Sequence, residues 1–577
     1  MRFNVKFPLK QPLLQAQWDA LSCIHLQLQK IHEEQYQYRE THSPGSQAPS
    51  GGQSSNREAR PRNDWIRRMT FPDESDGAIQ RRLRQLAHSR GLFDAQCNYE
   101  QLQAVNSACE ADFGVLPFLI SGPPGTGKTK TLVEIALQLL NTTDVAHILI
   151  CAPSDQAADT LALRLRQHLS PEKLLRLNGP QRADNEVPGE LLGYCYRDRD
   201  MFYLPPISRL MKYNIVVTST RDAAILANAR VTNADLYLIE KNMHSAFHPE
   251  DENTGPTRLR WGALLLDEAA QATELDVMPA LTVVMPPSQY PANLQQPRLI
   301  MAGDQEQLGP RTASNDPRCS RSLFARLFER PLYKTHPLSR NRVRASVEPP
   351  VLNSSMLPML YPPFANLMRN YRSHPAILTV PSCLFYNDTL IPEAPIETNT
   401  PLQASSIWQG KKYPVLYVPI TSLDDIEYEG GGWYNNFECQ TACAIAARLV
   451  TEAQVPQREV AIISPFAAQV KRLRNLMRSP TYSLWDVNIG PLEAFQGLES
   501  RVVILCTTRT RERFLAEDIQ RGVGIIGLRR KMNVALTRAK AGLVVLGNPN
   551  VLALDEHWKA FLAFCHRNGD GEGLRVV

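Results

Sequence analysis

The hydrophobic positions of this chain fall into two series of short apolar runs, each interleaved with helical or irregular stretches. Strand-length apolar runs that alternate with helices are typical of parallel sheets covered by helices. The pattern therefore predicts an α/β fold with two such sheets in tandem. The first series occupies residues 115–120, 147–152, 213–218, 263–266 and 299–302. The second occupies residues 415–418, 460–463, 502–507 and 543–547, with helical spacing of apolar residues over 437–450, 467–478 and 531–539.

The amino-terminal part of the chain has a different pattern. Residues 13–38 carry apolar side chains at helical spacing, which predicts a helix that packs on a larger body. Residues 41–61 turn to Ser, Gly, Pro, Gln and charged residues, a composition that cannot bury enough apolar surface to fold. We expect residues 1–95 to form a helical extension with a disordered insert at 41–61.

Irregular segments set the remaining domain boundaries. The first α/β domain is expected at residues 96–330, with insertions at about 165–206 and 244–262 that form small subdomains or loops. A stretch rich in Pro, Ser and Arg at 331–365 is the expected linker, and residues 366–577 are the expected second domain.

Charge and composition constrain the function only weakly. The 577 residues include 63 basic and 58 acidic side chains, and the net charge of +5 permits a nucleic-acid partner without requiring one. The closest cysteine pair, Cys439 and Cys443, lacks a second pair or a histidine cluster, so the scattered thiols indicate a reducing compartment rather than zinc. No apolar run could span a bilayer, and the amino terminus lacks a secretion signal. We expect a soluble, cytoplasmic protein, with ribonucleoprotein granules or the nucleus as open alternatives.

A glycine-rich loop between an apolar run and a helical pattern is the strongest chemical signal. Glycines let the backbone turn its N–H groups toward a phosphate, a lysine reaches the β and γ oxygens, and a hydroxyl binds Mg²⁺. The loop predicts an ATP and Mg²⁺ site. Its residues are Gly122, Pro123, Pro124, Gly125, Thr126, Gly127, Lys128 and Thr129.

Two further polar groups leave predicted strands downstream of this loop. Asp267 and Glu268 follow the run 263–266, where Asp267 can bind Mg²⁺ and Glu268 can act as general base toward the attacking water. Gln307 follows the run 299–302 and could sense the γ-phosphate. Taken alone, each group would more often be a solvated turn. Their positions after strands and after the phosphate loop favour catalysis.

The motifs, taken in order, resemble those of a superfamily 1B helicase of the up-frameshift-like group, with tandem RecA-like P-loop NTPase domains. The branch of RNA-silencing helicases that includes Armitage and Moloney leukaemia virus 10 is the one that this chain resembles most, at residues 367–374, in the tail at 547–550 and 558–569, and in the early segment 3–14. The matching segments are 98–101, 119–130, 152–159, 217–220, 267–271, 303–310, 370–374, 464–469, 493–499 and 533–540.

The resemblance implies a role for individual residues. Gln101 would bind the adenine edge, Tyr371 would stack on the base, and Glu499 would approach the ribose or couple the domains. Arg372 and Arg538 would act as arginine fingers on the γ-phosphate from the second domain. The expected nucleic-acid contacts, mostly to phosphate and sugar, are Pro153, Ser154, Thr218 and Thr220.

The chain also departs from the family pattern. The family usually has Asn where this chain has Asp155, which places a carboxylate near the nucleic-acid path, and Pro491 replaces a small hydroxyl residue. The large amino-terminal region of the branch is nearly absent, which suggests a shortened form or an incomplete gene model.

The resemblance implies an ATP-dependent RNA helicase that moves 5′ to 3′ on single-stranded RNA as a monomeric motor, with RNA-silencing or RNA-decay proteins as partners. Two alternatives stay open from the sequence. One is a DNA helicase of the same superfamily, because motor motifs do not distinguish the sugars. The other is an ATP-gated RNA clamp that does not unwind.

Overall fold

The computed structural model describes most of the chain. The described residues are 11–41, 63–78, 90–199, 201–250, 258–312, 314, 316–343, 361–395, 402, 406–408, 413–427 and 432–568. The predicted disordered insert at 41–61 lies outside them, except for residue 41. Within the described residues, no helix is long and apolar enough to cross a bilayer.

The first domain is built on a parallel sheet of seven strands in the order β3-β6-β2-β7-β8-β1-β9. Its central strands are buried almost completely, which explains their continuous apolar sequences. The strands are β1 (Phe118–Ser121), β2 (His147–Ala152), β3 (Leu174–Arg176), β6 (Ile215–Ser219), β7 (Trp261–Leu266), β8 (Arg298–Gly303) and β9 (Phe364–Asn366).

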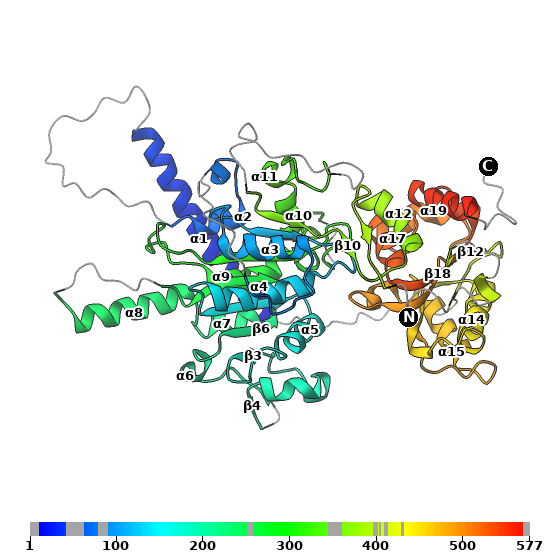
Figure 1. Cartoon of the computed structure of the whole chain (residues 1–577), viewed down its shortest axis with the longest axis horizontal. Helices are drawn as coiled ribbons and strands as arrows, with labels where there is room; N and C mark the ends of the chain where they lie inside the picture. Colours follow the sequence, from blue (N-terminus) through cyan, green and yellow to red (C-terminus); the bar gives the residue numbers. More distant parts are fainter. Residues whose placement is uncertain are drawn as a thin grey trace, which may run out of the picture.

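Helices surround this sheet and share one hydrophobic core with it. They are α3 (Tyr99–Glu110), α4 (Lys128–Thr142), α5 (Asp155–Leu165), α6 (Ile207–Leu210), α7 (Ala223–Asn228), α8 (Asn233–Phe247), α9 (Glu274–Val284), α10 (Leu323–Phe328) and α11 (Pro331–Lys334). The predicted amino-terminal helix is present as α1 (Gln11–Thr41), which lies along α9, and α2 (Trp65–Thr70) buries Trp65 in the same core. Figure 1 shows α1 and α8 extending from this domain.

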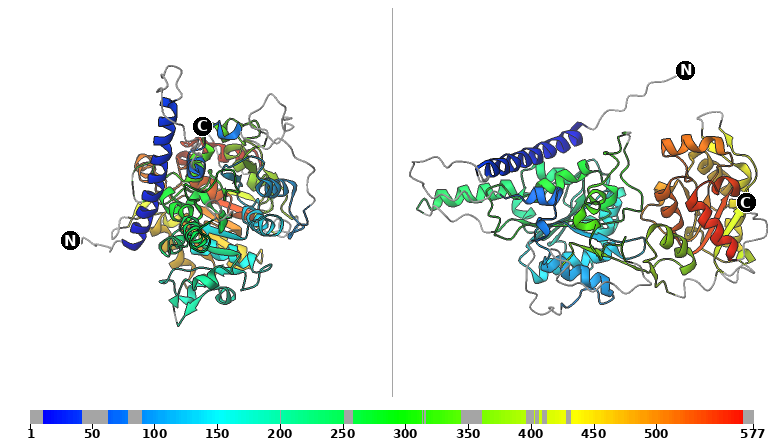
Figure 2. Two further views of the ribbon diagram at one scale, coloured as in Figure 1. Left: turned by 90° about the vertical axis from the view of Figure 1, so that its left-hand side faces the viewer. Right: turned by 90° about the horizontal axis from the view of Figure 1, so that it is seen from above.

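The second domain has a parallel sheet of five strands in the order β12-β18-β17-β15-β16. Its strands are β12 (Val415–Pro419), β15 (Val460–Ile463), β16 (Asn488–Gly490), β17 (Ser500–Cys506) and β18 (Ala539–Gly547). Its helices are α12 (Pro375–Phe385), α14 (Asn436–Thr451), α15 (Ala467–Met477), α16 (Leu515–Arg521), α17 (Arg529–Leu536), α18 (Pro549–Leu552) and α19 (Glu556–Arg567). The two domains lie side by side along the long axis (Figure 2).

The sequence pattern located the main strands of both sheets and the helices around the second, so the α/β fold with tandem sheets is confirmed. The structure also shows what the pattern missed. The segment 165–206 contains the edge strand β3 and a small hairpin, β4 (Arg197–Asp198) and β5 (Met201–Phe202). The segment 331–365 contains α11 and most of β9, which pairs with β1 and so extends the first sheet.

Candidate nucleotide site and adjoining nucleic-acid face

The phosphate loop leaves β1 at the carboxyl edge of the first sheet and enters α4. Gly125 and Gly127 adopt positive φ angles of 72° and 85°, a conformation that a side chain disfavours. A Cβ atom at Gly127 would lie 2.4 Å from Nε2 of Gln101. That same amide nitrogen donates a hydrogen bond of 3.0 Å to the carbonyl of Thr126. The glycines therefore allow Gln101 to brace the loop.

Catalytic side chains of the first domain gather beside this loop. Lys128 is buried, and its Nζ lies 2.9 Å from the carbonyl of Gly122 and 3.8 Å from Oε1 of Glu268. The hydroxyl of Thr129 donates to Oδ2 of Asp267 over 2.7 Å. A hydroxyl and a carboxylate are oxygen ligands that Mg²⁺ prefers, and a lysine at a helix N-terminus suits a phosphate. These donors fit an ATP–Mg²⁺ complex.

The acidic pair, Asp267 and Glu268, combines a strained backbone with a buried carboxylate. Glu268 has a φ of 47°, which is rare for a residue with a side chain and stores local strain. Burial and the neighbouring charge of Glu268 raise the pKa of Asp267 to about 6. Gln271 donates to Oε2 of Glu268 over 2.8 Å, which fixes the carboxylate beside the loop.

The second domain contributes two arginines to the same cleft. Nε of Arg372 donates to Oε2 of Glu499 over 2.5 Å, and Glu499 also pairs with Lys540. Burial alone would raise the pKa of Glu499, but the two cations hold it below its ordinary value. Arg538 is only 2% exposed, and burial lowers its pKa to about 9. Its Nη2 donates to Oε1 of Gln307 in the first domain over 3.1 Å.

A buried chain of hydrogen bonds continues from Gln307 across the domain boundary. Gln307 donates to Oδ2 of Asp304 over 2.9 Å, and the same oxygen accepts the hydroxyl of Tyr386 over 2.7 Å. Asn533 donates to that hydroxyl over 2.6 Å. Asp304 and Gln307 follow β8 in the first domain, whereas Tyr386 and Asn533 belong to the second.

The segment that enters the second domain also closes over the phosphate loop. Nδ2 of Asn370 donates to the carbonyl of Pro124 over 2.6 Å, and the amide of Tyr371 donates to the carbonyl of Gly125 over 2.9 Å. The hydroxyl of Tyr371 accepts from Asn98 over 2.8 Å. Asn98 also exchanges hydrogen bonds with Gln101, so it links Tyr371 to Gln101 at one cleft.

Many of these groups line one cleft of about 880 Å³ between the domains. The predicted residues Gly122, Pro123, Thr126 and Asp267 are not part of its lining, and neither are Asp304, Asn370, Tyr386 and Asn533. The lining includes the predicted residues Gln101, Pro124, Gly125, Gly127, Lys128, Thr129, Glu268, Gln307, Tyr371, Arg372, Glu499 and Arg538. Its size is in the range of small-molecule sites. Sequence reasoning assigned no role to Asn370, Asp304 or Tyr386. Asn370 directly precedes Tyr371, and this position could have indicated a role at the site. The sequence around Tyr386 contains no motif that would have indicated one.

Pro153, Ser154 and Thr220, three of the predicted nucleic-acid contacts, follow the carboxyl ends of β2 and β6, whereas Thr218 lies within β6. Ser154 is exposed, and its hydroxyl accepts from the amide of Ala157 as the cap of α5. Thr220 is 2% exposed, and its amide donates to the carbonyl of Ala152, which joins the two loops. Thr218 is fully buried, and its hydroxyl donates to the carbonyl of Leu177. The exposed atoms of this face therefore belong to Pro153 and Ser154 rather than to the threonines.

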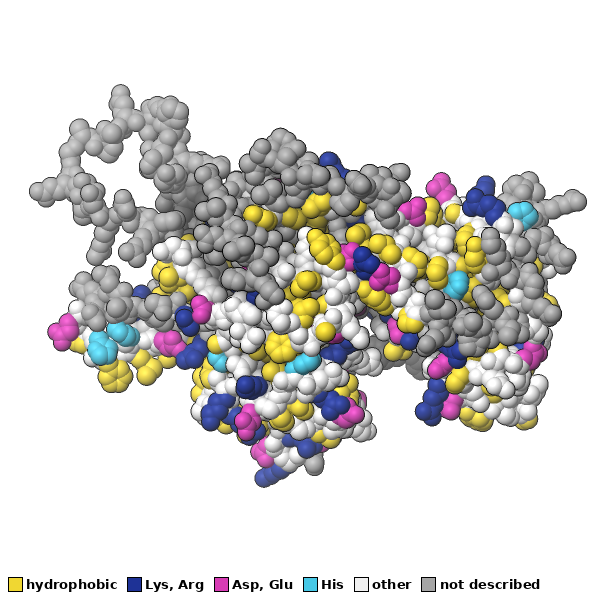
Figure 3. All heavy atoms as spheres, in the orientation of Figure 1, with side chains coloured by type: hydrophobic (Ala, Val, Ile, Leu, Met, Phe, Trp, Pro, Cys, Tyr) yellow, Lys and Arg dark blue, Asp and Glu magenta, His cyan; other side chains and the backbone are white. Residues whose placement is uncertain are grey.

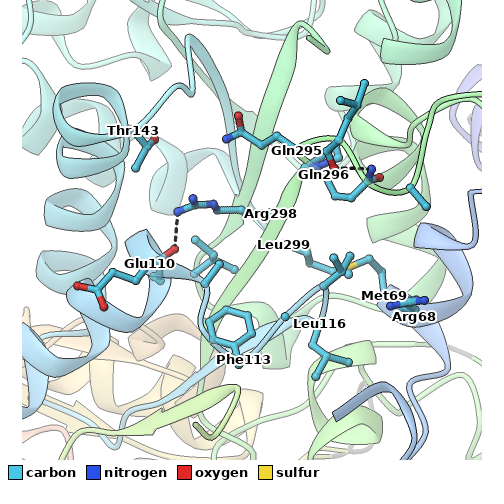
Figure 4. A pocket seen from close by; sticks show the side chains of 18 of the residues that line it. Arg68, Met69, Glu110, Phe113, Leu116, Thr143, Gln295, Gln296, Arg298 and Leu299 are labelled. Carbon is cyan, nitrogen blue, oxygen red and sulfur yellow. Dashed lines mark hydrogen bonds between the residues drawn. The ribbon is translucent and has the colours of Figure 1, made fainter. Parts of the chain in front are cut away.

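A second pocket of about 520 Å³ lies at the opposite, amino-terminal ends of β1 and β8. Figure 4 shows Phe113, Leu116 and Arg298 around it, and Arg298 donates to the carbonyls of Ala108 and Cys109. The phosphate loop is at the other end of the sheet, so we assign the nucleotide to the interdomain cleft. On the face in Figure 3, basic and acidic side chains are interspersed.

The described residues contain no group of three or more His, Cys, Asp or Glu that could hold a metal ion. Cys439 and Cys443 are buried in the core of the second domain.

Comparison with known proteins gives matches over most of the chain. Two family models, each described as an AAA domain, match residues 96–197 and 353–550. RNA helicase Mov10l1 of Homo sapiens is 30% identical over 516 residues, 88% of this chain and 37% of that protein. A probable RNA helicase of Drosophila melanogaster, armi, is 26% identical over 491 residues, 82% and 39% of the two chains. ATP-dependent helicase upf1 of Schizosaccharomyces pombe is 27% identical over 466 residues, which are 78% of this chain and 45% of that protein. The match thus spans less than half the length of each of these relatives.

Proposed function

Because this chain belongs to the up-frameshift-like group of superfamily 1B helicases, we propose that it is an ATP-dependent RNA helicase that moves 5′ to 3′ on single-stranded RNA. The observation that carries the proposal is the interdomain cleft, in which Lys128 and Glu268 of the first domain face Arg372 and Arg538 of the second. A motor of this kind couples hydrolysis to domain movement because its catalytic groups are complete only when both domains contribute.

Each side chain has a defined part in this reaction. Lys128 balances charge on the β and γ oxygens, and Thr129 and Asp267 hold Mg²⁺. Held by these two residues, Mg²⁺ would supply positive charge beside the phosphates. Glu268 accepts a proton from the attacking water. Arg538, desolvated and hydrogen-bonded to Gln307, stabilises the transferring phosphoryl group from the second domain.

The remaining predicted contacts complete the proposal. Gln101 and Tyr371 contact the adenine, Glu499 pairs with Arg372 and Lys540 in the same cleft, and Arg372 joins Arg538 on the γ-phosphate. Pro153 and Ser154 grip the nucleic-acid backbone, with Thr218 and Thr220 supporting them from below. Contacts of this type read phosphate and sugar, so binding depends on salt and not on sequence.

We propose RNA-silencing or RNA-decay proteins as partners and the cytoplasm as the location, because the relatives named above include Mov10l1 and armi. One chain contains both domains and therefore both sides of the cleft, which supports a monomeric motor.

Two measurements test the proposal. ATP hydrolysis should rise on addition of single-stranded RNA, and Lys128→Ala should remove it. A duplex with a 5′ single-stranded RNA tail should be displaced, and one with a 3′ tail should not. Stimulation by DNA alone would favour a DNA helicase. RNA-stimulated hydrolysis without displacement of either duplex would favour an ATP-gated clamp.

A further inference from the structure

Asp155 adjoins Ser154 on the proposed nucleic-acid face. It is the first residue of α5, directly after Ser154, and its side chain is 42% exposed. Where the family usually has Asn, this chain therefore presents an acidic group beside the residues proposed to grip the backbone. An ionised carboxylate accepts hydrogen bonds and cannot donate them.

A buried arginine supports this carboxylate from below. Arg176, at the end of β3, is completely buried, and its Nη2 donates to Oδ1 of Asp155 over 3.0 Å and to the Asp155 carbonyl over 3.3 Å. Nε of Arg176 donates to Asp159 over 2.9 Å, and Asp159 also pairs with Arg182. These two carboxylates and two guanidinium groups balance one another. Asp155 is thereby fixed in orientation and its charge is compensated within the protein.

The arrangement leaves one oxygen of the carboxylate available. Among the described residues, Oδ1 of Asp155 has Arg176 as its partner, and no hydrogen bond to Oδ2 is observed. The neighbouring loop after β6 adds a second acid, Asp222, whose pKa is raised by burial and by the charge of Asp155. A carboxylate accepts hydrogen bonds and cannot donate to a phosphate, so Asp155 needs a hydrogen-bond donor on the strand.

The backbone of a nucleic acid offers very few hydrogen-bond donors. Phosphate oxygens and the bridging sugar oxygens are all acceptors, and the 2′-hydroxyl of ribose is the backbone group that can donate. Carboxylates already serve this purpose in dinucleotide-binding folds, where an acidic side chain binds a ribose hydroxyl. DNA lacks the donor and would leave the carboxylate facing phosphates.

We infer that Asp155 accepts a hydrogen bond from a ribose 2′-hydroxyl and thereby selects RNA over DNA at this step of the strand. The inference rests on the proposed function, because it needs a strand that crosses the face formed by Pro153 and Ser154. It assigns sugar recognition to a residue at which this chain departs from its family.

The test compares three single strands of one sequence: RNA, DNA and RNA with 2′-fluoro sugars, which keep an RNA-like pucker but cannot donate. Fluorescence anisotropy of the full chain should show tighter binding to RNA than to the other two by about tenfold, the size expected for a hydrogen bond to a charged group. Asp155→Asn should reduce the RNA preference to about threefold or less, because a neutral amide oxygen is a weaker acceptor than a carboxylate and the amide nitrogen can also donate to the phosphates that RNA and DNA share. The matched control is Asp235→Asn, which should retain the RNA preference. This change removes a carboxylate on α8 that pairs with Arg230.

A second measurement does not depend on the variant folding. A single 2′-fluoro sugar moved along an otherwise unmodified RNA should weaken binding to the unaltered protein at one or two adjacent positions. Equal binding of RNA and fully 2′-fluoro RNA, or a preference unchanged in a folded Asp155→Asn protein, would overturn the inference while the helicase proposal stands. Failure to bind any single strand would overturn both.

Discussion

Arg538, which follows α17 in the second domain, donates a hydrogen bond of 3.1 Å from Nη2 to Oε1 of Gln307 in the first domain. Gln307 is held in turn by Asp304, so the guanidinium is positioned by a group from the opposite side of the cleft. Since both residues line the cleft that also contains Lys128, a ligand at the γ-phosphate position would contact both domains at once. The interdomain contact and the catalytic contact therefore involve the same arginine.

Substitutions at Glu268 and Arg538 should both stop turnover, but they should leave the two domains at different distances from each other. Glu268→Gln removes the base and should lower turnover by about 10²–10⁴-fold, while ATP still draws the domains together. Arg538→Ala should lower turnover by about 10³-fold or more and should also weaken closure. A fluorescence distance between the domains, measured with ATP and single-stranded RNA, should be short for the first variant and longer for the second.

Arg529→Ala provides the control for this comparison. It also removes an interdomain ion pair, with Glu306 at 3.0 Å, but that arginine is half-exposed and outside the cleft lining. It should leave turnover within about twofold, because a surface ion pair contributes about 0–1 kcal/mol. Identical distances in the Glu268→Gln and Arg538→Ala proteins would refute the assignment of Arg538 as a trans-domain arginine.

Tyr386 should affect turnover through the position of Gln307. Tyr386→Phe keeps the buried ring but removes the hydroxyl that joins Asp304 to Asn533. We expect stability to fall by about 1–3 kcal/mol and kcat to fall about tenfold, with KM for ATP unchanged, because the substrate contacts remain. Steady-state ATPase kinetics with and without RNA would measure this.

Tyr417→Phe is the matched control, since it removes a buried hydroxyl that donates to the carbonyl of Gly547 over 2.7 Å, away from the cleft. If the Tyr417→Phe protein lost kcat to the same extent, the effect at Tyr386 would be one of stability alone.

The phosphate loop and the acidic pair were predictable because their chemistry is local in sequence. A glycine-rich loop between a strand and a helix specifies its own geometry, and the structure places Thr129 against Asp267 as that reading requires. The main strands were predictable for a similar reason: strands buried on both faces are continuous apolar runs.

Contacts between distant segments were not predictable in this way. Asn370 reaches the carbonyl of Pro124 across 246 residues, and β9 joins the first sheet although its three residues are too few to carry a periodic pattern. Similarly, the sequence placed the carboxylate of Asp155 near the nucleic-acid path but gave no sign of Arg176, which donates to it in the structure. Such partners are determined by the tertiary fold, which a single sequence does not encode as a local signal.

Gly125→Ala should disrupt nucleotide binding without unfolding the protein. The residue has a φ of 72°, and a Cβ atom would lie 2.5 Å from Cβ of Arg372 and 2.9 Å from Nδ2 of Asn370. The methyl group would therefore push the second-domain segment away from the loop. We expect ATP affinity to fall at least about tenfold, because backbone strain of about 1–3 kcal/mol is added to the clash.

The control for this glycine is Gly522→Ala, which has a φ of 63° but open space around the added atom. It should lose similar stability from strain and keep its affinity for ATP, as measured by calorimetric titration. Equal loss of ATP affinity in both variants would indicate that strain, and not the contact with Arg372, is responsible.

The pH dependence of stability should be reduced by a change at Glu438, in the second domain. Its carboxylate is completely buried and accepts from the amide of Thr508 over 2.9 Å and from Gln469 over 3.0 Å. Burial raises the pKa of Glu438 from 4.5 to about 8. The folded state therefore holds a proton that the unfolded chain releases near pH 4.5. This contribution to stability is fully present below pH 4.5 and is lost as the pH rises to about 8.

Thermal unfolding of the full chain from pH 5 to pH 9 would test this. Glu438→Gln cannot ionise, so its midpoint should fall less steeply with pH than that of the unaltered protein, and the two curves should cross or converge toward alkaline pH. Glu427→Gln, which removes a carboxylate paired with Lys471 on the surface of the same domain, should follow the unaltered protein. Parallel curves for Glu438→Gln and the unaltered protein would mean that Glu438 is already ionised in the fold. In that case the loop around Thr508 would be stabilised by a charged group.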